Sequence, residues 1–193
     1  MAIHSLAVVM TPVILVGLLL IEPFLQWWLN PEFGAQAGLT AQILLLGFWI
    51  NAFARVPYAQ LQAAGLPGVV ARCHLAEVIP YLLLLYAGLH FWGLPGAAVV
   101  FGLRTLADCV LLLWFAGNLA VGFSALRVPA LLLLAGLGVA AGLPFCSVLW
   151  WLAAPGLLLL SLVWSWRNAP LEVRSLARRM VNKLRPDQRE KFR

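Results

Sequence analysis

The chain has 193 residues, of which 63% are hydrophobic and only 10% are charged, and its mean hydropathy is +0.94. A soluble domain is usually about half apolar and about a quarter charged, so this composition excludes an ordinary water-soluble fold. The apolar runs are long and uninterrupted, whereas the strands of a membrane barrel would alternate over about ten residues. We therefore expect an all-α integral membrane protein.

Six apolar segments are candidates for helices that cross a bilayer, which needs roughly 20 residues. They cover residues 3–29, 39–56, 69–91, 97–118, 128–143 and 147–166. The segment 57–67, between the second and the third, is expected to form a separate short interfacial helix. The fifth contains Gly138 and Gly142 at GxxxG spacing, which allows another helix to approach closely. The first 166 residues thus form a transmembrane region of about six helices.

The net charge of +6 is carried by the end of the chain. Residues 1–166 hold four arginines and four acids, whereas residues 167–193 hold nine basic residues and three acids. Apolar residues recur in this tail at about helical spacing. We expect a basic amphipathic helix on the cytoplasmic membrane surface rather than a nucleic-acid-binding segment. A frayed charged tail is the alternative beyond Pro186.

The basic residues also predict an orientation. If the tail is cytoplasmic and six helices cross the membrane, the N-terminus is cytoplasmic too. The connections next to Arg55, Arg72 and Arg127 then lie inside, and the outer connections carry no Lys or Arg. This distribution agrees with the positive-inside rule. No cleavable signal peptide is expected.

Ionisable residues inside the third and fourth apolar segments are the candidate functional groups. Arg104 is expected near mid-membrane, and Asp108 lies one turn further on the same face, where the two can pair. Glu77 is expected at a similar height on the neighbouring helix, and His74 can share its face. Such residues at membrane depth usually face a cavity, a partner or a pathway.

Two interpretations of these charges are open. They can form a salt-bridged cluster that locks two helices together, or they can line a polar path for an anionic head group. In the second interpretation the head-group-binding residues are Arg55, Arg72 and Arg104, and the proton-coupling or polar-network residues are Glu77, Asp108 and His74. Because Arg104 would hold Asp108 in its charged form, we expect Glu77 to exchange a proton and Asp108 to be the structural partner.

The sequence contains no motif that predicts an enzyme. It lacks HExxH, GxSxG and a phosphate-binding loop, and its three cysteines and three histidines are scattered. We therefore expect no enzymatic activity, no cofactor and no metal. A small membrane enzyme acting on a polyprenyl or phospholipid substrate and a structural membrane subunit remain the alternatives to a transporter.

Three stretches carry a resemblance to a known family. They read WWLNPEFGAQA, INAFARVPYAQLQAAGLPGVVARCHLAEVIPYLLLL and GLPGAAVVFGLRTLAD. In this order they resemble the C-terminal half of oligosaccharide (O-antigen type) flippases of the multidrug/oligosaccharidyl-lipid/polysaccharide exporter superfamily. The resemblance covers roughly residues 1–120. It implies a transporter built from two lobes, of which this chain corresponds to the last six helices.

The resemblance also implies a function. Such flippases translocate undecaprenyl-pyrophosphate-linked oligosaccharide units across the bacterial inner membrane for surface polysaccharide biosynthesis, by alternating access through a cationic cavity. The expected partners are the lipid-linked oligosaccharide, membrane lipids, and a missing N-terminal lobe or a second protomer, with no nucleic acid. The chain is then expected to be a truncated gene product, the product of a wrongly assigned start, or one half of a split transporter.

Overall fold

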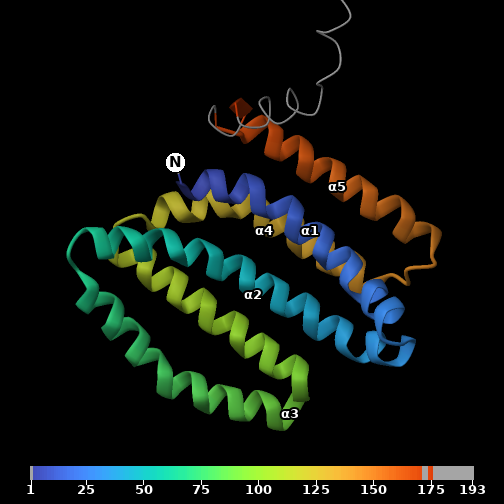
Figure 1. Cartoon of the computed structure of the whole chain (residues 1–193), viewed down its shortest axis with the longest axis horizontal. Helices are drawn as coiled ribbons and strands as arrows, with labels where there is room; N and C mark the ends of the chain where they lie inside the picture. The colour runs from blue at the N-terminus through green and yellow to red at the C-terminus, as the bar shows by residue number, and fades with distance from the viewer. Residues whose placement is uncertain (1, 171–173, 176–193) are drawn as a thin grey trace, which may run out of the picture.

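The computed structural model describes residues 2–170 and 174–175, which are almost entirely helical (Figure 1). The helices are α1 (Ala2–Trp28), α2 (Pro31–Ala63), α3 (Pro67–Phe115), α4 (Leu119–Gly142) and α5 (Val148–Asn168). All five are long and apolar enough to cross a membrane. No strand occurs in the described part of the chain. The expected all-α membrane class is therefore confirmed.

Helix α3 is a hairpin of two spans. If it were straight, its 49 residues would extend for about 74 Å, more than twice the roughly 30 Å of a bilayer's hydrocarbon core. Gly93 breaks it with φ 62° and ψ −143°, a backbone conformation that favours glycine. The arms on either side, residues 67–92 and 94–115, run back along each other (Figure 1). The described residues therefore form six apolar segments of membrane-spanning length, as the sequence predicts.

The two arms of α3 touch where both carry a glycine. Gly88 and Gly96 are buried, and a Cβ on Gly96 would overlap the carbonyl oxygen of Gly88. In contrast, nothing lies within 4 Å of a Cβ added to Gly138 or Gly142. The GxxxG pattern of α4 therefore marks no close helix contact within the described residues. Helix α4 instead packs on α1 through Gly136, where a side chain would collide with α1.

Helix α2 is longer than the predicted segment 39–56 at both ends, because it already begins at Pro31 and because Pro57 does not end it. Pro57 is fully buried, and the helix continues through it to Ala63. The expectation of a separate helix over 57–67 is thus corrected: most of this segment belongs to α2. A proline removes only one backbone hydrogen bond, and packing on both sides can hold the helix together. Helix α4 also begins earlier than expected, at Leu119.

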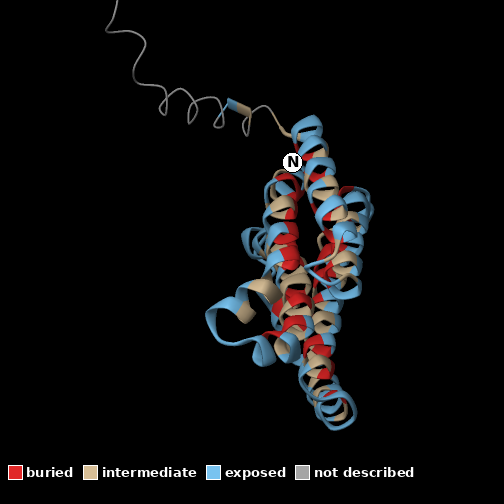
Figure 2. Cartoon of the chain, turned by 90° about the vertical axis from the view of Figure 1, so that its right-hand side faces the viewer, coloured by how far each residue is buried: buried red, intermediate tan, exposed pale blue. Residues whose placement is uncertain are grey.

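Helix α1 lies at the centre of the packing and contacts α2, α4 and α5. Its residues Ala7, Leu15 and Leu18 are completely buried and recur at helical spacing. Figure 2 shows buried residues along the middle of the bundle and exposed ones around it. The first arm of α3 lies at the periphery, where large side chains such as Leu75 and Ile79 are exposed. Apolar side chains exposed on such a helix suit contact with lipid or with another membrane segment.

The predicted amphipathic helix over 167–193 lies largely outside the described residues. Arg174, which is described, donates from Nη2 to the carbonyl oxygens of Trp166 and Arg167, at 3.0 and 3.1 Å. These two bonds satisfy acceptors that the C-terminus of α5 would otherwise leave open. The start of α1 and the end of α5 lie at the same end of the bundle (Figure 1), as an even number of crossings requires.

Candidate functional site

Two close contacts between a basic and an acidic side chain join the arms of α3, and no others are found within residues 2–170 and 174–175. His74 Nε2 lies 3.1 Å from Asp108 Oδ1, and Arg104 Nε lies 3.8 Å from Glu77 Oε2. His74 and Glu77 are one turn apart on the first arm, and Arg104 and Asp108 are one turn apart on the second. Because the arms are antiparallel, the earlier residue of the first arm, His74, faces the later residue of the second arm, Asp108, and Glu77 faces Arg104.

The pairing of Arg104 differs from the sequence expectation. Instead of pairing with Asp108 on its own helix, Arg104 reaches across the hairpin to Glu77. Its guanidinium carbon also lies 4.9 Å from the centre of the Tyr81 ring, a cation–π contact. A pair at i,i+4 on one helix contributes only about 0.2–0.5 kcal/mol. The hairpin brings Glu77 and Tyr81 of the first arm within reach of Arg104, and these two interactions together can be stronger than a pair with Asp108 on the same helix.

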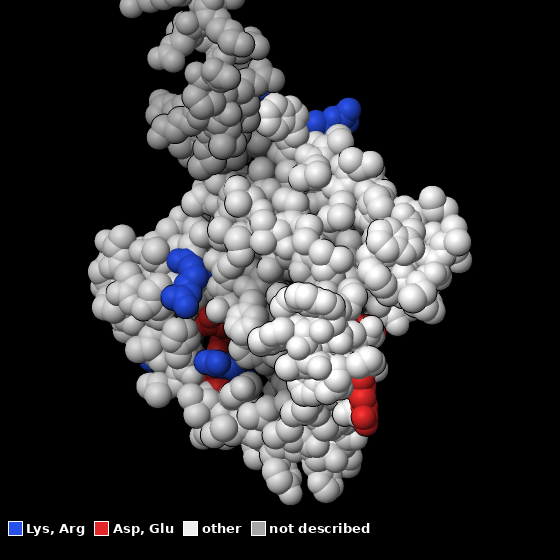
Figure 3. All heavy atoms as spheres, turned by 45° about the vertical axis from the view of Figure 1, so that its right-hand side comes forward, with Lys and Arg blue, Asp and Glu red and all other residues white. Residues whose placement is uncertain are grey.

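A polar cavity of about 290 Å³ opens between α2 and α3 beside these pairs. It is lined by Asn51, Ala54, Arg55 and Tyr58 from α2 and by His74, Arg104, Thr105, Asp108 and Leu112 from α3. The ring of Tyr58 stacks on His74 with centroids 6.3 Å apart and planes 12° apart. Figure 3 shows basic and acidic atoms side by side in a hollow of the surface. The cavity thus offers cationic and hydrogen-bonding groups within otherwise apolar helices.

Glu77 is the most enclosed side chain of the charged cluster. It is 9% exposed, compared with 15% for Asp108 and 39% for Arg104. Neither of its carboxylate oxygens accepts a hydrogen bond from any described residue. Glu77 does not line the cavity, whereas Arg104 contacts both Glu77 and the cavity. An enclosed carboxylate is costly unless it is paired, so Glu77 depends on where the Arg104 side chain lies.

The other two predicted head-group residues differ in position. Arg55 lines the cavity and is exposed. Arg72 does not line it: its side chain is exposed, and Nε donates to the carbonyl oxygen of Gly68 at 3.1 Å. The structure therefore brings Arg55 and Arg104 together in one cavity, and a role for Arg72 stays a prediction.

Three polar residues of the cavity were missing from the predicted site, namely Asn51, Tyr58 and Thr105. A signal for the first two is present in the sequence. Asn51, Arg55 and Tyr58 follow one another at i, i+4 and i+7, which places them on one face of α2. Thr105 has no such signal, because its position at the cavity depends on how the second arm of α3 is turned.

Fold and site together define a polytopic helical membrane protein with a charged cluster and a polar cavity within the spans. Over 103 residues, or 53% of this chain, the sequence is 38% identical to a Shigella flexneri protein named "Putative O-antigen transporter". The matched region is 25% of that protein, so the chain spans about a quarter of the length of this curated relative. The resemblance predicted from the sequence is thereby confirmed. No family model matches the chain, and no solved structure matches it.

Proposed function

We propose that this chain is part of a transporter that moves oligosaccharide units linked to undecaprenyl pyrophosphate across the bacterial inner membrane, rather than an enzyme. The similarity to a protein named as an O-antigen transporter supports the class of cargo. The observation that carries the proposal is the polar cavity between α2 and α3, which presents Arg55 and Arg104 inside apolar helices. A second lobe or a second protomer supplies the remaining wall of the transport path.

The pyrophosphate head group is the part of the substrate that this cavity is suited to bind. Arginine presents a planar fork of donors that matches phosphate oxygens, and its charge does not depend on pH. Arg104 has five N–H donors, so it can contact more than one phosphate oxygen. Arg55 provides a second cation at the same cavity. We assign Arg72, which lies outside the cavity, to the first encounter with the head group.

A second cavity beside α2 and α3 is apolar and could hold the hydrocarbon chain of a lipid. An apolar cavity of about 450 Å³ is bounded by α2, the second arm of α3 and α4, with residues such as Ile50, Leu106 and Leu133 in its lining. A polar cavity and an apolar one on neighbouring faces suit a substrate that has both a charged head and a long apolar tail. This arrangement favours a lipid-linked cargo over a free sugar.

Glu77 couples head-group binding to a proton in this proposal. When Arg104 turns toward a phosphate, Glu77 loses its salt-bridge partner in an enclosed position. Uptake of a proton removes the unpaired charge, so proton binding to Glu77 and phosphate binding to Arg104 favour each other. His74 and Asp108 form the polar network that holds the two arms in register.

Binding of undecaprenyl pyrophosphate to the purified chain in detergent, followed by native mass spectrometry, tests the head-group assignment. We expect Arg104→Gln to weaken binding at least tenfold, since a charge-assisted hydrogen bond contributes about 1.5–3 kcal/mol. Arg167→Gln, at the end of α5 and outside the cavity, is the matched control and should bind as the wild type does. Equal binding of phosphatidylglycerol would contradict the proposal, because it would show attraction to any anionic lipid.

The pH dependence of the same binding tests the coupling. Wild-type affinity should rise as the pH falls, because a neutral Glu77 releases Arg104 to the ligand. In Glu77→Gln most of this dependence should disappear, and in the complete transporter the same variant should uncouple transport from the proton gradient. His74→Gln serves to measure how much of the pH dependence of binding comes from protonation of the histidine. An unchanged pH profile in Glu77→Gln would remove Glu77 from the mechanism.

A further inference from the structure

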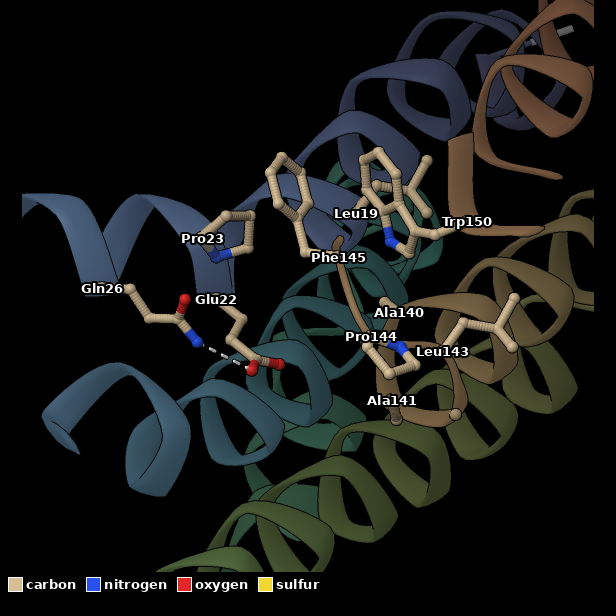
Figure 4. A pocket seen from close by; sticks show the side chains of 11 residues that line it. Leu19, Glu22, Pro23, Gln26, Ala140, Ala141, Leu143, Pro144, Phe145 and Trp150 are labelled. Carbon is tan, nitrogen blue, oxygen red and sulfur yellow. Dashed lines mark hydrogen bonds between the residues drawn. The ribbon is translucent and has the colours of Figure 1, made fainter. Parts of the chain in front are cut away.

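A second polar cavity, of about 240 Å³, lies toward the opposite end of the bundle, where α1 ends and α4 connects to α5. Figure 4 shows its lining side chains. The lining includes Glu22 and Gln26 of α1, Ala140 of α4, Pro144 and Phe145 of the connection between α4 and α5, and Trp150 of α5. None of these residues belongs to the charged cluster of α3, so this is a separate site.

One wall of this cavity carries hydrogen-bonding groups. Gln26 Nε2 donates to Glu22 Oε1 at 3.1 Å, which holds the two side chains together one turn apart on α1 (Figure 4). Gly38 of α2 makes room for the carboxylate, because a Cβ there would come within 2.9 Å of the Glu22 side chain. Pro144 has no N–H, so the carbonyl oxygen of Ala140 lacks its usual donor at the end of α4. The cavity is therefore rich in acceptors.

Two aromatic side chains also line the cavity. Phe145 is 36% exposed and packs against Trp150, with ring centroids 4.5 Å apart and planes at 61°. Trp150 is 5% exposed, and its backbone N–H donates to the Ser147 hydroxyl at the start of α5. The buried indole thus supports Phe145 and limits its motion. A supported aromatic ring can stack on the C–H face of a molecule whose hydroxyl groups bind acceptors elsewhere in the same cavity.

We propose that this cavity binds one pyranose ring of a carbohydrate. Its volume is slightly below the roughly 300–1,000 Å³ of pockets for drug-sized ligands, which suits a single ring rather than an oligosaccharide. It is also several times the roughly 30 Å³ that one water molecule occupies, which is too large for a bare monovalent cation. A ligand with hydroxyl groups can form further hydrogen bonds with the Glu22 carboxylate and the Gln26 amide, whereas an apolar ligand would meet these polar groups without bonding to them.

The site deepens the proposed function, on which the choice of a sugar over other polyols rests. The charged cavity would hold the head group, and this second cavity would contact a sugar of the attached oligosaccharide toward the other side of the membrane. In the predicted orientation the connection between α4 and α5 is on the outside. The sugar would then meet this site as it leaves the membrane.

Saturation-transfer NMR on the purified chain in detergent tests the proposal. The probes are methyl glycosides of glucose, galactose, rhamnose and N-acetylglucosamine. We expect at least one to receive signal from the protein, and both Glu22→Gln and Phe145→Ala to reduce that signal at least fivefold. Glu22→Gln is nearly isosteric, and far-UV circular dichroism checks that each variant is folded.

The chain offers a matched control for Glu22. Glu32 accepts from Gln36 Nε2 at 3.4 Å, which is the same pairing at i,i+4 on an exposed helix face away from the cavity. Glu32→Gln should leave the sugar signal unchanged. The inference is overturned if no glycoside binds, if Glu32→Gln acts like Glu22→Gln, or if sodium alone competes for the site in a Glu22-dependent way.

The two proposals fail in different ways. Arg104→Gln should leave glycoside binding intact, and Glu22→Gln should leave binding of undecaprenyl pyrophosphate intact. Loss of glycoside binding with intact head-group binding would overturn only the sugar site. Glycoside binding without any binding of undecaprenyl pyrophosphate would overturn the head-group assignment and leave a sugar-binding membrane protein.

Discussion

A double-mutant cycle on Arg104 separates the pairing seen in the structure from the pairing expected from sequence spacing. The structure pairs Arg104 with Glu77 across the hairpin, whereas the spacing of the second arm favours Asp108. The cycle uses Arg104→Leu with Glu77→Leu, and a second cycle uses Arg104→Leu with Asp108→Leu. The coupling free energy of each cycle reports the interaction of that pair alone.

The expected size of the coupling follows from distance and exposure. At an effective dielectric constant of about 20, unit charges about 4 Å apart attract by about 4 kcal/mol. Arg104 is 39% exposed, so solvent screens part of this attraction, and fully exposed pairs contribute only about 0.2–1 kcal/mol. Since Glu77 is only 9% exposed, we expect a coupling of about 1–2 kcal/mol. For Arg104 and Asp108 we expect less than about 0.5 kcal/mol.

The assay is equilibrium unfolding of the purified chain in detergent, followed by far-UV circular dichroism during a titration with sodium dodecyl sulfate. The single variants should also differ in character. Arg104→Leu alone should be the most destabilising, because it leaves the enclosed Glu77 carboxylate unpaired, and adding Glu77→Leu should restore part of the stability. A larger coupling for Arg104 with Asp108 than with Glu77 would refute the reasoning.

Three further predictions concern packing and orientation. Gly96→Ala should lower the free energy of unfolding by about 1–3 kcal/mol, because its methyl group meets the backbone of Gly88, while Gly102→Ala, with nothing within 4 Å, should be neutral or stabilising. Cys146, which is exposed in the connection between α4 and α5, should react with a membrane-impermeant maleimide on intact spheroplasts; reaction only after permeabilisation would reverse the predicted orientation. Asn118→Ala removes an exposed 2.9 Å hydrogen bond to Gln60 of α2, and should shift the unfolding free energy by no more than about 1 kcal/mol. A loss above about 2 kcal/mol would show that this contact has a larger role.

Much of the fold could be predicted because hydropathy and helix-breaking residues act locally. The six crossings follow from segments whose backbone must be hydrogen-bonded internally in lipid. The exact ends were less predictable, since Pro57 is a helix breaker by its chemistry but lies inside a packed helix here. Gly138 and Gly142 show the same limit. Their spacing permits a close helix contact, but whether a neighbour lies there depends on how α4 is turned.

The candidate site, too, could be predicted from the sequence only in part. The sequence predicts that Glu77, Arg104 and Asp108 lie within membrane spans, because each stands in an apolar segment. The same position makes them candidate functional residues. Which acid the arginine contacts does not follow, because it depends on the offset and rotation of two antiparallel arms. These are set by the turn at Gly93 and by the contact between the arms at Gly88.

By itself the sequence determined the membrane class of this chain and which residues bring charge into its apolar segments, because hydropathy and charge are properties of the individual residues. Only the tertiary structure decided which groups meet. It paired His74 with Asp108 across the hairpin, and it placed Glu22 of α1 beside Phe145, a residue far away in the chain. Contacts of this kind depend on the relative position of whole helices, which no local pattern of residues specifies.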